Sequence, residues 1–120
     1  MSDIDDLRSA LASARADGRQ PNLLRAYRSL GQGYLAAARV DEGESALRTA
    51  IAQARIHGDP LELGLGLLEL GRAQCTLGRP DRALLAYTEA AGCLRELDPE
   101  AHQVASDELR ALTSAPGGAR

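Results

Sequence analysis

One pattern of residues occurs twice in this chain, with its landmarks 40 residues apart. A Leu-Gly pair at residues 30–31 recurs at residues 70–71, and a partial third copy precedes both, because residues 47–55 (LRTAIAQAR) echo residues 7–15 (LRSALASAR). A fixed period of this length is typical of stacked helical repeats, in which each unit buries its apolar face against the next. The repeat therefore predicts an all-α architecture.

The composition agrees with helices rather than sheets. Hydrophobic residues make up 44% of the 120 residues, yet aromatic residues make up only 2%. Strands favour β-branched and aromatic side chains, whereas Ala and Leu favour helices. A core of Ala and Leu also requires helices that approach one another closely, since small side chains fill only narrow gaps.

Gly and Pro residues divide the apolar pattern into about six helical segments joined by short connections. Short connections make sequential helices antiparallel, so we expect stacked helical hairpins. The last residues are rich in Gly and Pro and are expected to form a disordered tail. The expected single domain, residues 1–113, comprises an orphan helix (2–17), a first repeat (21–58), a second repeat (60–97) and a closing helix (99–113), followed by the tail (114–120).

The repeated segments resemble the tetratricopeptide repeat family. Residues 27–34 read Y-x2-L-G-x2-Y and residues 67–74 read L-x2-L-G-x2-Q, and Ala83, Tyr87 and Ala90 occupy later positions of the family pattern. The period of 40 exceeds the family's usual value of about 34, and is similar to the longer-helix variety of kinesin light chains and bacterial regulators. The resemblance implies a tetratricopeptide-like α-solenoid whose function is to bind proteins.

Two glycines of the repeat lie within expected helices. A helix-interior Gly costs about 1 kcal/mol relative to Ala, so Gly31 and Gly71 need a structural reason. We expect the paired helix of each hairpin to approach the backbone at these positions more closely than a larger side chain would allow.

Several functional classes lack support in the sequence. The formal charge is −3, with acidic and basic residues interspersed, so nothing favours direct binding to nucleic acid or to an anionic membrane. The most apolar stretch, residues 61–70, is too short and too charged to cross a bilayer. The acidic start of the chain differs from a secretory signal. We therefore expect a cytoplasmic protein.

No arrangement of residues indicates catalysis, a cofactor or a metal. Cys75 and Cys93 would be separated by about 15 Å along their helices, beyond the reach of a disulfide. His57 and His102 belong to different hairpins, and no phosphate-binding loop or nucleophile–base motif is present. We expect a protein that is not an enzyme and that carries no cofactor.

The remaining candidate site is one face of the first helix of each hairpin. Counting from the Leu-Gly landmarks places a basic and polar set on the first of these helices and a mainly apolar set on the second. One interpretation is a solvated stripe of arginines beside core leucines. The other is a groove in which guanidinium groups bind carboxylates and leucines bind an apolar anchor of a peptide or helix. The candidate partner-binding residues are Arg25, Arg28, Gln32, Leu35, Leu65, Leu68 and Arg72.

The sequence thus predicts an adaptor that binds a peptide or an amphipathic helix, acidic in character, of a partner protein. One alternative is a module that oligomerises itself, and another is a regulatory subunit or domain of a bacterial transcriptional regulator. The orphan helix lacks a hairpin partner to cover Ile4, Leu7 and Leu11. A weak homodimer through this end or through the leucine-rich fourth helix is therefore one expectation, and a monomer capped by the first helix is the other.

Overall fold

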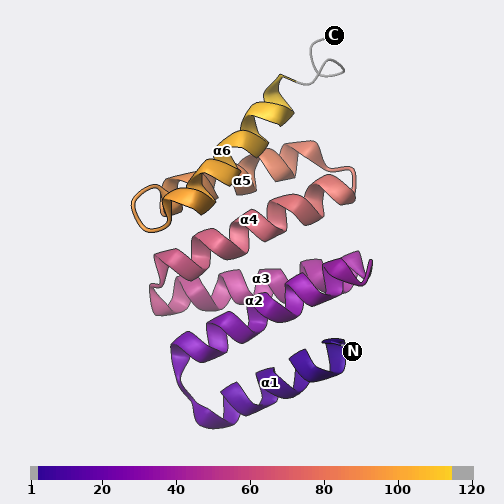
Figure 1. The fold of residues 1–120 in the computed structure, drawn as a ribbon, viewed down its shortest axis with the longest axis vertical. Helices are drawn as coiled ribbons and strands as arrows, with labels where there is room; N and C mark the ends of the chain where they lie inside the picture. Colours follow the sequence, from indigo (N-terminus) through magenta and orange to yellow (C-terminus); the bar gives the residue numbers. More distant parts are fainter. Residues whose placement is uncertain (1–2, 115–120) are drawn as a thin grey trace.

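In the part of the chain that the structure describes, six antiparallel helices follow one another along the stack (Figure 1). The structure, a computed structural model, describes residues 3–114. Consecutive helices pack against each other, and α2 also contacts α4 directly. Figure 1 shows α2, α4 and α6 in front of α3 and α5. The helices are α1 (Asp3–Asp17), α2 (Gln20–Ala36), α3 (Val40–His57), α4 (Pro60–Thr76), α5 (Pro80–Leu94) and α6 (Pro99–Thr113).

These bounds agree with the expected segments within a few residues. Residue 2, which we expected to begin the first helix, and residues 115–120 of the expected tail lie outside the described part of the chain. Within residues 3–114, none of the six helices combines the length and the apolar character needed to cross a membrane.

The connections between helices follow from local residue chemistry. Pro60 and Pro99 stand at the first turn of α4 and α6, where a missing N–H leaves no donor unsatisfied. The preceding Asp59 and Asp98 cap these helices, since each carboxylate accepts a backbone N–H bond of 3.0 Å. Sequence and structure therefore agree on where these two helices begin.

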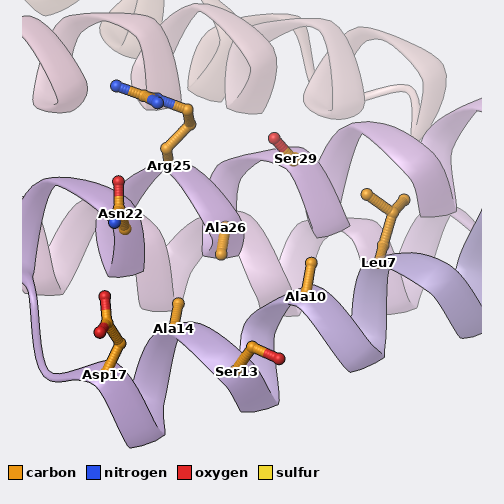
Figure 2. Close-up of a pocket in the computed structure, with 9 residues that line it drawn as sticks. All are labelled: Leu7, Ala10, Ser13, Ala14, Asp17, Asn22, Arg25, Ala26 and Ser29. Atoms are coloured by element: carbon orange, nitrogen blue, oxygen red, sulfur yellow. The ribbon is translucent and has the colours of Figure 1, made fainter.

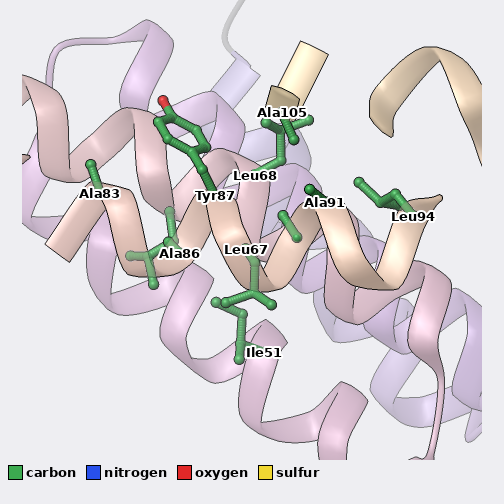
Figure 3. Close-up of a cluster of buried hydrophobic side chains, with 11 residues drawn as sticks. Ile51, Leu67, Leu68, Ala83, Ala86, Tyr87, Ala91, Leu94 and Ala105 are labelled. Atoms are coloured by element: carbon green, nitrogen blue, oxygen red, sulfur yellow. The ribbon is translucent and has the colours of Figure 1, made fainter. Parts of the chain in front are cut away.

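The core is continuous from α3 to α6 (Figure 3). Tyr87 and Leu94 of α5 belong to this core and are 1% and 0% exposed. The repeat is expected to bury the apolar face of each unit, and ten of its Leu, Gly, Ala and Tyr positions are buried: Leu30, Gly31, Tyr34, Leu47, Ala50, Leu70, Gly71, Ala83, Tyr87 and Ala90.

Both Leu-Gly landmarks mark a close approach between the helices of a hairpin. A Cβ atom on Gly31 would lie 2.6 Å from Cγ of Leu47, and one on Gly71 would lie 2.5 Å from Cε1 of Tyr87. The two contacts join residues at the same positions of the two repeats. The expected reason for these glycines is confirmed.

Candidate functional site

Arg28, one of the predicted binding residues, joins α2 to α4. Its Nε and Nη2 atoms donate to Oε1 and Oε2 of Glu62 at 2.7 and 3.3 Å. The two side chains are only 16% and 11% exposed. The guanidinium group of Arg28 is therefore held by a carboxylate of the same chain, and we assign it a positioning role between the two helices.

A second polar contact joins the same helices further along. Gln32 donates through Nε2 to Oε2 of Glu69 at 2.9 Å. The same carboxylate oxygen accepts a long bond of 3.5 Å from Nη1 of Arg72, whose side chain is 44% exposed. Gln32 thus holds Glu69 in place, while Arg72 keeps much of its surface open.

The predicted leucines do not share one environment. Leu68 is 5% exposed and belongs to the core, as in the alternative interpretation of these positions as core leucines. α4 is in contact with α2, α3 and α5, and for this reason little of its circumference is left for a surface. Leu65 is partly buried against the same core, and Leu35 is also partly buried.

Leu35 and Arg72 come together in one pocket of about 400 Å³, which we call the inner pocket. It lies where the end of α2 and the start of α3 meet the second half of α4. Its apolar side is formed by α2 and α3, and its charged side by α4. The lining residues are Leu35, Ala36, Ala38, Val40, Glu69, Arg72 and Thr76.

Arg25 lies elsewhere, in an open groove of about 560 Å³ between α1 and α2, which we call the end groove (Figure 2). Arg25 is exposed and forms no ion pair with the residues whose side chains the structure describes, 4–114. Small and apolar side chains form most of the surface. The lining residues are Leu7, Ala10, Ser13, Ala14, Asp17, Asn22, Arg25, Ala26 and Ser29.

A third hollow, of about 490 Å³, lies between α3 and α5 and was not predicted. Leu85, 73% exposed, and Arg82 form one wall. Nearby, Glu44 of α3 accepts bonds from Arg48 and from Gln74 of α4, at 2.9 and 2.7 Å. Burial raises the pKa of Glu44, but these bonds outweigh it and hold the pKa below its ordinary value.

The inter-helix carboxylates are the functional neighbours that the sequence analysis missed. A signal was present, since an Arg is followed by a Glu 34 residues later in both Arg28–Glu62 and Arg55–Glu89. A separation of 34 residues is close to the repeat period of 40, so each pair joins residues of neighbouring units.

The cysteines and histidines do not form a reactive cluster. Cys75 and Cys93 are both free, and Cys75 lies with Sγ 3.9 Å from the hydroxyl oxygen of Tyr87. The ring Nδ1 of His102 is 2.9 Å from the carbonyl oxygen of Ala91, and His57 is exposed at the end of α3. In the described part of the chain, no three His, Cys, Asp or Glu side chains are grouped as metal ligands would be.

The comparisons with known proteins assign no family. No protein-family model matches the chain, and no curated protein matches it significantly.

Proposed function

We propose that this chain is a non-catalytic protein-interaction adaptor that binds a peptide or helix of a partner protein across α2 and α4. The inner pocket carries the proposal, because it combines the partly buried Leu35 with the exposed guanidinium of Arg72. Such a pocket suits a segment with an apolar anchor next to a carboxylate. Arg25 lies in the end groove, outside this site.

The resemblance to tetratricopeptide repeats supports the same function, since that family uses the first helix of each hairpin to bind proteins. Arg28 and Gln32 act here by fixing Glu62 and Glu69 rather than by reaching the partner. The specificity of the site then depends mainly on Arg72, with Glu69 excluding partners that are acidic over their whole length.

The experiment compares three baits in the lysate of the native host. The inner-pocket variant carries Arg72→Glu and Thr76→Arg, both at exposed positions. The matched control carries Arg82→Glu, an exposed charge reversal on α5. Circular dichroism first establishes that all three baits are equally folded.

We expect quantitative mass spectrometry to find proteins that the wild type and the control retain equally and that the inner-pocket variant loses at least tenfold. Equal retention by all three baits, or retention of nothing by the wild type, contradicts the proposal.

A further inference from the structure

The N-terminal helix is related to α2 as α3 is related to α4. Residues 7–15 of α1 correspond, 40 positions earlier, to residues 47–55 of α3. α1 packs on α2, and α3 packs on α4. Leu7 contacts α2 closely at Gly33. α1 is therefore the second helix of a hairpin whose first helix is not among the described residues.

The face of α3 that carries Leu47 and Ala50 is covered by α2. Ala50 is 3% exposed and Leu47 is 0% exposed beneath the backbone of Gly31. Their counterparts in α1 are Ala10, which is exposed, and Leu7, which is only partly buried. Both counterparts line the end groove, as Figure 2 shows.

The α2 side of the end groove obeys the same correspondence. Asn22 and Ser29 stand 40 positions before Glu62 and Glu69. Those two carboxylates are the residues of α4 that bind side chains of α2. Both walls of the end groove are thus equivalent to surfaces that α2 covers in the next unit. The end groove continues the interface between helices inside the stack, and its shape suits an α-helix.

The charge of the end groove differs from that of its counterpart inside the stack. Asn22 and Ser29 replace two carboxylates, and Arg25 replaces Leu65. A helix in this position therefore meets the amide of Asn22 where α2 meets Glu62, and it meets the guanidinium group of Arg25 about one helical turn further along α2. Asp17 also lines the end groove, and its carboxylate is paired with Arg19 at 3.6 Å. Where α2 carries Arg28, the occupant would face Asn22 and stand about one turn from Arg25, and neither of these side chains is a carboxylate. Charge complementarity therefore favours an acidic residue at that position of the occupant.

The opposite end of the chain does not offer such a helix. The exposed side of α6 is polar, with Asp107 accepting bonds from Gln103 and Arg110 at 2.9 and 3.0 Å. A second copy that approached with α6 would place these polar groups against Ala10 and Leu7 without new partners, which is costly. The occupant is better supplied by another protein.

We propose that the end groove binds an acidic amphipathic helix of a partner protein, which completes the N-terminal hairpin with α1. The proposal concerns a different surface from the inner pocket and stands independently of it. The helix would bury Leu7 and Ala10 and place a carboxylate beside Arg25.

Two synthetic peptides test the proposal by fluorescence anisotropy against the full chain. One has the sequence of residues 20–36, and the other has the same sequence with Arg28→Glu. The protein variants are Ala10→Arg, which fills the end groove at an exposed helical position, and Arg25→Glu, which reverses its charge. Arg82→Glu, on α5, is the matched control.

We expect the acidic peptide to bind the wild type at least tenfold more tightly than the basic one. Arg25→Glu should reverse this preference, Ala10→Arg should weaken both peptides at least tenfold, and Arg82→Glu should change neither. Absence of binding, or binding that Ala10→Arg leaves intact, overturns the proposal.

Light scattering over a tenfold concentration range tests the other possible occupant of the end groove, a second copy of this chain. A strictly monomeric wild type supports a partner helix. If the wild type is instead a dimer that Ala10→Arg converts to a monomer, the end groove is occupied by a second copy, and the proposal is overturned.

Discussion

Gly71 lies so close to the ring of Tyr87 that a Cβ atom on residue 71 would come within 2.5 Å of the ring. Tyr87 is 1% exposed and is enclosed by the helices around it. Because the enclosed ring of Tyr87 has no space to move away, α4 can lie this close to α5 only with a glycine at position 71. The contact fixes how closely α4 and α5 pack.

The first prediction follows from this contact. Gly71→Ala should lower the free energy of unfolding by about 1–2 kcal/mol, because overpacking outweighs the gain in helix propensity. Gly92→Ala is the matched control, since apart from the adjoining residues and the backbone of its own helix no atom lies within 4 Å of the added Cβ there. It should raise the free energy of unfolding by about 0.5–1 kcal/mol. Urea denaturation measures both, and equal signs for the two substitutions would contradict the assignment.

The two hairpin turns give a second pair of substitutions. Ala38 has φ 63° and the equivalent Gly78 has φ 73°, both in the left-handed region that favours Gly. Ala38→Gly should therefore stabilise the chain by about 0.5–1 kcal/mol, and Gly78→Ala should destabilise it by a similar amount. Thermal denaturation followed by circular dichroism compares them. A loss of stability in Ala38→Gly would show that the turn does not strain residue 38.

The third prediction separates buried from exposed ion pairs. Arg28→Ala leaves Glu62 unpaired between α2 and α4, with a side chain only 11% exposed, and should cost about 3 kcal/mol. Arg55→Ala removes a pair whose side chains are 50% and 41% exposed, and should cost less than about 1 kcal/mol. Similar losses in chemical denaturation would mean that α2 and α4 separate when Arg28 is removed.

The fourth prediction concerns acid. Hydrogen bonds from Arg55 lower the pKa of Glu89, and the bonds to Glu44 lower its pKa despite burial, both from an ordinary value of 4.5. A carboxyl with a lowered pKa in the folded state contributes stability above pH 4.5, and this contribution is lost as the pH falls through the folded-state value. The unfolding free energy should therefore decline below pH 4.5, and Glu44→Gln should make the decline less steep.

The two thiols give a fifth prediction. Cys75 is exposed, whereas Cys93 is partly buried and burial raises its pKa. The thiolate is the reactive form, so iodoacetamide at pH 7.5 should alkylate Cys75 faster than Cys93. Peptide mass spectrometry after timed quenching measures both rates. Faster alkylation of Cys93 would place that thiol in a more open environment than the one described.

The helices and the buried positions of the repeat could be predicted because their signals are local. Asp59-Pro60 starts a helix through its own side chain and ring, and the glycine that recurs at the same repeat position, Gly31 and Gly71, indicates a close contact between paired helices. A period of 40 residues then aligns the same signals in successive units. None of these inferences required knowledge of how each helix is rotated about its own axis relative to its neighbours.

The candidate site depended on that rotation and was only partly predictable. α4 carries leucines on every side, so the sequence alone does not distinguish the core position of Leu68 from a surface position. Gln74 departs from the repeat pattern, yet it is 1% exposed and bonds to Glu44 across the helices. The equivalent Tyr34 accepts bonds from Arg8 of α1 instead. Residues 34 and 74 thus both form a hydrogen bond to the preceding helix, but through different side chains.

The shallow burial of α1 has a consequence for how the chain would report the presence of a partner. Ala14 is the one residue among 4–17 with less than a tenth of its surface exposed, so the backbone bonds of α1 have little packing to protect them. Segments of this kind exchange amide hydrogens through local opening well before the core does. A helix that covered Ala10 and Leu7 would extend protection into α1 and leave the distant α5 almost unchanged. Hydrogen exchange along the chain would then rank the helices by their distance from the bound partner.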